Sequence, residues 1–210
     1  LAHLRQMADA TDLPLSADLE NGFGPEPETV ANTIRLAATT GIVGASIEDG
    51  SGDRHAPILP LALATDRIRA AVEAARALPF PFTLTARAEN YFVGQPDLAD
   101  TIQRLQAYQE AGADVLFAPG LRTREDIAAV LSAVDRPVNV LMGLDGVTLT
   151  VADLEAMGVK RISVGGSFAR AAYGAFLRAA REVQEHGSFS YTNEAISGRD
   201  ITRLLRGTRS

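Results

Sequence analysis

A strand-like segment followed by an amphipathic helix recurs about six times, and this repeat constrains the fold more than any other feature. Short apolar runs bounded by Gly or Pro mark the strands, and apolar residues three or four positions apart mark the helices. Strands that alternate with helices predict parallel βαβ units, and strands this apolar are typical of a sheet covered by helices. The predicted strands occupy residues 14–20, 41–49, 82–89, 114–120, 137–143 and 161–166.

The segments between these strands carry helix-start and helix-stop signals. Pro27 near a start and Gly41 after an end follow the expected asymmetry of helix termini. Thr65 or Asp66 is available as a cap, and Thr123, three residues before an acid, is close to a capping box. The predicted helices occupy residues 27–41, 63–78, 97–112, 123–134, 150–158, 167–187 and a short stretch near 198–206.

Two architectures are compatible with this repeat. A closed (β/α)₈ TIM barrel has eight such units and typically about 250 residues. An open doubly wound sheet predicts a glycine-rich phosphate turn, and the sequence has no GxGxxG. The chain opens within a helical pattern at residues 1–8, so we predict a barrel whose first two units precede this numbering. We expect a barrel domain over residues 1–187 and a C-terminal helical extension over 188–210.

Composition excludes several classes of protein. The formal net charge of −6 is spread without basic patches, which argues against a nucleic-acid partner. No apolar run reaches the length of a membrane span, so no membrane partner is expected. The chain has no cysteine, which removes disulfides, thiolate metal ligands and cysteine nucleophiles and fits a cytoplasmic protein.

Charged side chains gather where three consecutive predicted strands end. Asp18 and Glu20 end the first, Glu48 and Asp49 end the second, and Arg87 and Glu89 lie at the end of the third. Residues two apart point to the same side of a strand, and strand carboxyl ends carry function in parallel α/β folds. Several carboxylates converging without a His or Cys cluster suit Mg²⁺ or Mn²⁺. A neighbouring arginine can then bind a substrate carboxylate or phosphonate in a two-pronged fashion.

Other interpretations remain open for individual residues. A single acid at a strand end is more often a helix cap or a solvated loop residue. His3 and His186 fall on helix surfaces, and His55, in a polar loop, is as readily solvated as catalytic. The VGGS sequence at 164–167 could hold an anion at a helix N-terminus, or could reflect close packing.

These motifs resemble the isocitrate lyase/phosphoenolpyruvate mutase family, and the likeness covers nearly the whole chain. The family has two acids spaced by one residue and followed by Gly-aromatic-Gly, then a strand ending in Glu-Asp, then Ala-Arg-x-acid. The matching segments here are Asp18-Leu-Glu20-Asn-Gly22-Phe-Gly24, Ile47-Glu48-Asp49 and Ala86-Arg87-Ala88-Glu89, with a further likeness over 111–119.

The resemblance implies a Mg²⁺-dependent or Mn²⁺-dependent lyase or mutase acting on a small 2-oxo acid or dicarboxylate. Such enzymes break or form a C–C or C–P bond through an enolate-like intermediate. It further implies a homo-oligomer, a dimer of dimers, in which residues 188–206 are exchanged between subunits. The implied site residues are Asp18, Glu20 and Glu48 for the metal, Arg87, Glu48 and His55 for catalysis, and Arg87, Asn90 and Gly50 for substrate binding.

The loop after the Glu-Asp strand departs from the family pattern. Lyases of the family carry Lys-(Lys/Arg)-Cys-Gly-His there, whereas residues 50–57 read GSGDRHAP. Isocitrate-type cleavage, which uses that thiol, is therefore not expected. Decarboxylation of oxaloacetate or phosphonopyruvate-type chemistry needs only the metal, the arginine and water. The alternative is a non-catalytic barrel that binds a carboxylate, or a phosphate at VGGS.

Overall fold

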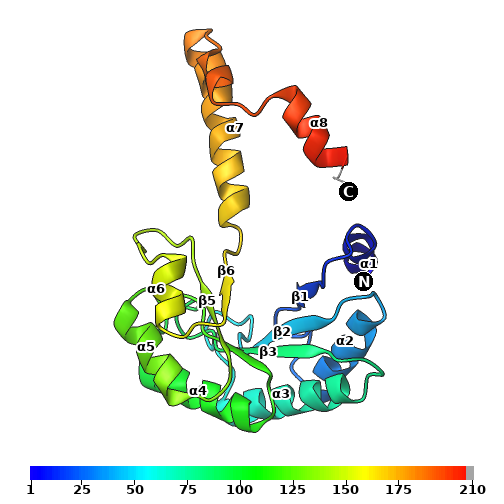
Figure 1. Cartoon of the computed structure of the whole chain (residues 1–210). Coiled ribbons are helices and arrows are strands. Elements are labelled where there is room, and N and C mark those ends of the chain that lie inside the picture. The colour runs from blue at the N-terminus through cyan, green and yellow to red at the C-terminus, as the bar shows by residue number, and fades with distance from the viewer. Residues whose placement is uncertain (207–210) are drawn as a thin grey trace. The chain divides into compact units, whose positions relative to one another are not determined.

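The computed structural model describes residues 1–206 and divides into two compact units, Leu1–Ser163 and a second unit that begins at Val164. The first unit holds six strands and the helices between them, and the second holds the C-terminal helices (Figure 1). The six predicted strands are confirmed, with shorter bounds. They are β1 (Ser16–Asp18), β2 (Gly44–Glu48), β3 (Thr83–Arg87), β4 (Val115–Phe117), β5 (Val138–Leu141) and β6 (Arg161–Ser163).

The predicted helices are also present, and their starts follow the local sequence. Helix α2 begins at Pro27, as expected from the fixed φ of proline at a helix start. The predicted cap of α3 is wrong: the helix begins at Leu61, and the Thr65 hydroxyl donates to the Leu61 carbonyl from inside its first turns. The helices are α1 (Ala2–Asp9), α2 (Pro27–Ala38), α3 (Leu61–Arg76), α4 (Leu98–Glu110), α5 (Arg124–Ala133), α6 (Val151–Ala156), α7 (Ser167–His186), the short 3₁₀ helix η1 (Ser190–Asn193) and α8 (Gly198–Arg206).

The six strands form one parallel sheet in sequence order, β1-β2-β3-β4-β5-β6. Each strand is followed by a helix, and α2 to α5 lie together on one side of the sheet (Figure 1). This arrangement is six consecutive βα units of a (β/α)₈ barrel, so the predicted fold class is confirmed. Because every neighbouring pair of strands is parallel, all the strand carboxyl ends lie at one rim of the sheet.

Alternation along the strands separates the core from the opposite face of the sheet. Ile47 in β2 and Leu84 in β3 are buried with Ile34 of α2 and Ala71 of α3 in the hydrophobic core. The neighbouring residue Glu48 points to the other face, because successive side chains alternate along a strand. Each fully buried large aliphatic side chain contributes about 1.5–3 kcal/mol to folding, so this core fixes which side chains face the barrel interior.

Side-chain caps fix the starts of the later helices. The Thr123 hydroxyl accepts a hydrogen bond from the Asp126 amide at the start of α5, which is half of the predicted capping box. The complete reciprocal box lies at α6, where Thr150 and Asp153 cap each other's backbone amides. These caps define where the loops above the sheet rim end.

The second unit begins with α7 and contains η1 and α8. Helix α7 ends at Gly187, whose φ of 61° is the left-handed conformation that glycine adopts without strain. The predicted division after residue 187 differs from this grouping and stays a prediction. Over the described residues, no helix is both long enough and apolar enough to cross a membrane.

Candidate active site

The rim formed by β1, β2 and β3 brings together the charged residues that end these strands. Glu48 and Arg87 are direct partners in the register of β2 and β3. Asp18 pairs with Ser46, whose hydroxyl donates to Asp18 Oδ1 at 3.3 Å. The Glu48 amide donates to the Glu20 carbonyl at 2.9 Å, which continues the β1–β2 ladder past the last strand residue. Parallel pairing therefore places three strand ends side by side, as predicted.

Arg87 is the centre of this cluster. Its Nη1 lies 3.0 Å from Asp18 Oδ2 and 3.3 Å from Glu48 Oε2, and its Nε donates to Glu89 Oε1. The acids come from β1, from β2 and from the residues just after β3. The predicted juxtaposition of Asp18, Glu48, Arg87 and Glu89 is therefore present, with the guanidinium bound among the carboxylates.

Two aromatic rings also contact the Arg87 guanidinium, which the sequence did not indicate. The Cζ atom of Arg87 lies 5.6 Å from the ring centroid of Phe92 and 5.4 Å from that of Phe117. Phe117 is the neighbour of Arg87 in the β3–β4 register. Cation–π contacts of this kind restrict the guanidinium further. Carboxylates and two aromatic rings thus both restrict the Arg87 guanidinium.

The carboxylates of the rim perturb one another. Burial, followed by the charge of Glu89, raises the pKa of Glu48 from 4.5 to about 7, even though Arg87 opposes this shift. Burial also raises the pKa of Glu89, and Arg87 only partly offsets it. Burial alone would lower the pKa of Arg87, but the carboxylates of Glu89, Glu48 and Asp18 outweigh burial and raise it. Several acids compete for one arginine, so the site has an excess of negative charge that a cation would relieve.

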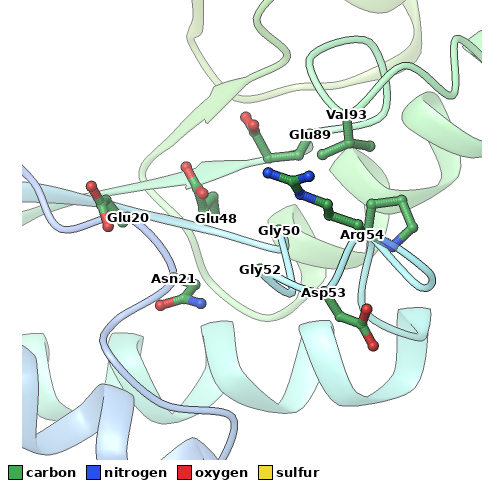
Figure 2. Close-up of a pocket in the computed structure, with 10 residues that line it drawn as sticks. Glu20, Asn21, Glu48, Gly50, Gly52, Asp53, Arg54, Glu89 and Val93 are labelled. Atoms are coloured by element: carbon green, nitrogen blue, oxygen red, sulfur yellow. The ribbon is translucent and has the colours of Figure 1, made fainter.

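A cavity of about 460 Å³ opens beside these acids, and Figure 2 shows the residues that line it. Glu20, Glu48 and Glu89 lie along one side, and the side chain of Arg54 extends toward Glu48 and Glu89 from the loop after β2. The sequence did not single out Arg54. The lining consists of Glu20, Asn21, Glu48, Gly50, Gly52, Asp53, Arg54, Pro57, Glu89 and Val93.

The loop after β2 is folded on itself at the mouth of this cavity. An antiparallel bridge joins Gly50 to Ile58, and the Ser51 amide donates to the Pro57 carbonyl at 2.9 Å. Gly50 lines the cavity, as its predicted role requires, and a Cβ atom there would lie 3.0 Å from Glu48 Oε1. His55 is exposed, its backbone amide donates to Asp53 Oδ1 at 2.8 Å, and it is not among the residues that line the cavity.

Asn90 is buried and directed toward helix α4. Its Nδ2 donates to Asp100 Oδ2 at 2.7 Å, and its Oδ1 has no hydrogen-bond partner among the described residues. Asn90 does not line the cavity beside Glu48. Its predicted role in substrate binding, like the catalytic role of His55, stays a prediction.

Asp49 belongs to a separate, buried network. It is 2% exposed and accepts hydrogen bonds from Tyr108 and Arg104 of α4 and from the Glu89 amide. Strand alternation explains why Asp49 faces the helices while the adjacent Glu48 faces the barrel interior. Arg104 also donates to the Leu59 carbonyl at 2.9 Å, so this network anchors both ends of the loop after β2.

The donor set is suited to a hard divalent cation. Mg²⁺ and Mn²⁺ prefer carboxylate oxygens as ligands, and here carboxylates outnumber arginines. Burial first, and then the charges of the neighbouring acids, raise the pKa of Glu48. Within residues 1–206, no three acids or histidines are grouped closely enough to share one metal ion, and Asp18 and Glu48 contact Arg87. The assignment of Asp18, Glu20 and Glu48 as metal ligands stays a prediction.

Comparison with known proteins agrees with the motifs at this rim. A family model described as phosphoenolpyruvate phosphomutase matches residues 1–184. The chain belongs to the phosphoenolpyruvate mutase/isocitrate lyase family. The matched residues include all six strands, and therefore every acid of the rim formed by β1, β2 and β3.

Two curated relatives in this family are similar over most of the chain. An uncharacterized protein of Mycobacterium tuberculosis (strain ATCC 25618 / H37Rv) is 34% identical over 81% of this chain and 62% of its own length. The 2-methylisocitrate lyase of Escherichia coli (strain K12) is 35% identical over 66% of this chain and 47% of its own length. The chain thus spans less than two thirds of the length of these relatives.

Solved structures of the family have the same fold. A protein of Burkholderia cenocepacia J2315, described provisionally as a lyase/mutase, is 58% identical with a TM-score of 0.95 over 99% of this chain and 74% of its own. A phosphonopyruvate hydrolase in complex with oxalate and Mg²⁺ is 25% identical with a TM-score of 0.80 over 97% of this chain and 72% of its own. The curved parallel sheet is therefore the family fold.

Proposed function

We propose that this protein is a divalent-cation-dependent enzyme that breaks or forms a C–C or C–P bond in a small 2-oxo acid or dicarboxylate. The observation that carries the proposal is the rim cluster, in which Asp18 and Glu48 from neighbouring strands contact the guanidinium of Arg87. An arginine beside an excess of carboxylates offers one site for a substrate anion and another for a cation. This combination suits a reaction in which negative charge develops next to a substrate carboxylate.

The acids Asp18, Glu20 and Glu48 are the proposed holders of Mg²⁺ or Mn²⁺. When bound, such an ion supplies electrophilic stabilisation of an enolate-type oxygen. The carboxylates themselves position that charge at the mouth of the cavity lined by Glu20, Glu48 and Glu89. Asp18 and Glu48 end adjacent strands, so the sheet register sets their positions, whereas Glu20 begins the loop after β1.

Two arginines are the proposed substrate-binding groups. Arg87 has a planar guanidinium fixed by Glu89 and by two aromatic rings, so it can present its other N–H groups to a carboxylate. Arg54 lines the cavity together with Glu48 and Glu89, two acids that also contact Arg87, so it can contact a second anionic group of the substrate (Figure 2).

The relatives support this substrate class. A similar protein of Rhodopseudomonas palustris (strain BisA53), 29% identical over 77% of this chain, is an oxaloacetate decarboxylase. The phosphonopyruvate hydrolase structure contains oxalate and Mg²⁺. The chain has no cysteine, so a mechanism that needs a thiol acid or base is not available to it. Oxaloacetate decarboxylation and phosphonopyruvate-type cleavage are therefore the reactions to test first.

The decisive experiment measures turnover of oxaloacetate and phosphonopyruvate with Mg²⁺, with Mn²⁺ and with EDTA. We expect activity only with the cation and a loss of at least about 100-fold in Arg87→Ala, because substrate positioning and charge stabilisation are both removed. Arg35→Ala is the control, since Arg35 is an exposed side chain that pairs with the exposed Glu28 on α2. Activity that survives both EDTA and Arg87→Ala would exclude the proposal. Oxalate binding without turnover of either substrate would favour a non-catalytic barrel.

We also propose that the protein is a homo-oligomer, a dimer of dimers, whose C-terminal extension is exchanged between subunits. Large apolar side chains on α7 support this: Phe168, Tyr173 and Phe176 are between 67% and 75% exposed. Exposed aromatic residues along one helix commonly mark a protein interface. Light scattering of the full chain and of Phe176→Glu tests it, and an unchanged monomeric mass in both would reject it.

A further inference from the structure

Arg67 in α3 is a buried guanidinium beneath the loop that carries Glu20. Its side chain is 1% exposed, and it donates hydrogen bonds to the main-chain carbonyls of Asn21, Gly24 and Pro25. The three carbonyls lie within five consecutive residues, 21–25, directly after β1. A planar group with five N–H donors can bind several carbonyls at once, which a lysine cannot do in the same geometry.

The charge of Arg67 is held by neutral partners. Its hydrogen bonds, within residues 1–206, go to main-chain oxygens, and its Nε has no partner there. Burial lowers the pKa of Arg67, and the charges of Tyr108, Asp49 and Glu26 only partly oppose this. An arginine buried against carbonyls is costly for folding unless the segment it binds gains order in return.

The loop over residues 20–25 has a strained backbone, so it requires contacts that hold it in one conformation. Glu20 has a φ of 50° and Phe23 a φ of 63°, and both are residues for which the left-handed region is unfavourable. Such conformations persist when surrounding contacts fix them. The Glu20 carbonyl accepts from the Glu48 amide, and the Gly22 carbonyl accepts from the Thr33 hydroxyl at 2.8 Å. Arg67 binds three more carbonyls of the same loop.

The loop is also pressed against α2, so it has little room to relax. A Cβ atom at Gly22 would lie 3.1 Å from Val30, and one at Gly24 would lie 2.6 Å from Thr29. With α2 on one side and Arg67 on another, the backbone of residues 21–25 is fixed. The direction of the Glu20 side chain, which begins this loop and lines the acidic cavity, follows from that fixed backbone (Figure 2).

We propose that Arg67 is a positioning residue: it fixes the strained loop after β1 and thereby keeps the Glu20 carboxylate beside Glu48 and Glu89 in the cation site. The proposal rests on the proposed function for its second half. Its first half concerns only the loop and can be tested without any ligand. A purely structural anchor would lower stability without changing cation affinity in the folded protein.

The test compares Arg67→Lys and Arg67→Met with Arg69→Lys and Arg69→Met. Arg69 lies on the same helix, is exposed, and pairs with Asp66. The first measurement is amide hydrogen exchange at Gly22 and Phe23, whose N–H groups bond within the loop. We expect at least about 10-fold faster exchange in Arg67→Lys, with amides of β2 and β3 unchanged, and no effect in the Arg69 variants.

The second measurement is the dissociation constant for Mn²⁺, determined by electron paramagnetic resonance. We expect about 10-fold weaker binding in Arg67→Lys and wild-type binding in Arg69→Lys. Native exchange in the loop of Arg67→Lys overturns the proposal, as does faster loop exchange with unchanged Mn²⁺ affinity. If Arg67→Met does not fold, Arg67→Lys decides. If the wild type binds no Mn²⁺, the proposed metal site fails, and the exchange measurement alone decides the role of Arg67 in the loop.

Discussion

Arg87 Nη1 and Glu48 Oε2 lie 3.3 Å apart across the β2–β3 register, yet the pKa of Glu48 is raised rather than lowered. Burial is the largest cause, and Glu89, Asp18 and Glu20 add repulsion that one guanidinium does not cancel. The rim is therefore arranged at a cost to the stability of the folded protein. Stored repulsion of this kind is typical of functional sites.

Replacing Glu48 with Gln removes that repulsion. The pKa of Glu48 is raised from 4.5 to about 7, so its ionisation lowers the stability of the folded state progressively between these pH values and by a constant amount above pH 7. A change of one in pKa corresponds to about 1.4 kcal/mol, and we expect a gain of about 1–2 kcal/mol at pH 8 after allowing for the lost contact with Arg87. Chemical denaturation without divalent cations measures it. Glu28→Gln, at an exposed ion pair, is the control and should change stability by less than about 0.5 kcal/mol. Lower stability in Glu48→Gln contradicts this account.

Cation and oxalate are expected to bind cooperatively. Without a cation, Arg87 Nη1 is engaged by Asp18 and Glu48. If a cation takes these carboxylates, the same N–H groups become available to a ligand carboxylate, and reciprocity requires each ligand to strengthen the other. Calorimetric titration with oxalate should give an affinity at least about 10-fold higher with Mn²⁺ than with EDTA. Equal affinities would show that Arg87 does not exchange partners.

The buried Tyr108 hydroxyl stabilises the base of the loop after β2. It donates to Asp49, which also accepts from Arg104 Nη1 at 3.1 Å and from the Glu89 amide at 2.8 Å. Tyr108→Phe leaves a buried carboxylate with one donor fewer, and we expect a loss of about 1–3 kcal/mol. Urea denaturation measures it, with Tyr91→Phe at a partly exposed position as the control. A loss no larger than that of the control would show that Arg104 and the Glu89 amide are sufficient donors for Asp49.

Asp153, in the capping box of α6, should make the stability of the folded protein depend on pH in a range where its contribution can be measured separately. Hydrogen bonds from the Thr150 side chain and amide, with a further one from Arg124, lower the pKa of Asp153 from 3.8 to about 2. A lowered pKa stabilises the folded state above the unfolded value and loses that effect as the pH falls through the folded one. Asp153→Asn should therefore be less stable than wild type at pH 7, and the difference should vanish between about pH 4 and pH 2. Thermal melts over this range, with Asp200→Asn as the control, decide it.

The repeating pattern was sufficient to predict the strands, their parallel order and the rim that carries the acids. The end of the first strand was overestimated because Glu20 has a φ of 50°, although its carbonyl still accepts from the Glu48 amide. Asp18, Glu48 and Arg87 could be found from the sequence. The period of two along a strand fixes the face of the sheet on which they lie, and parallel pairing places the strand ends at the same rim. Asp49 could be assigned only with the structure, since its partners Arg104 and Tyr108 lie more than fifty residues away.

Loop and packing contacts could not be read from the pattern. The aromatic contacts of Arg87 join a loop residue, Phe92, and a residue of the next strand. Arg67 looked like one of several arginines on an amphipathic helix, and its three carbonyl partners depend on how the loop after β1 folds. In the loop after β2, the sequence favoured His55, whereas the cavity is lined by the adjacent Arg54. In a loop, the direction of each side chain depends on local turns, and these turns follow no regular period in the sequence.

That difference between neighbours gives the sharpest test of the site. Arg54 faces the acidic cavity and is exposed, so Arg54→Ala should leave the melting temperature unchanged and lower kcat/KM for a dianionic substrate by about 10- to 100-fold. His55→Ala, one residue away and outside the cavity lining, should change kcat/KM by less than about 3-fold. Because Arg54 acts on the anion rather than on folding, most of its effect should appear in KM. A large loss in His55→Ala with little in Arg54→Ala would restore the assignment made from sequence and would mean that this loop closes differently around a bound substrate.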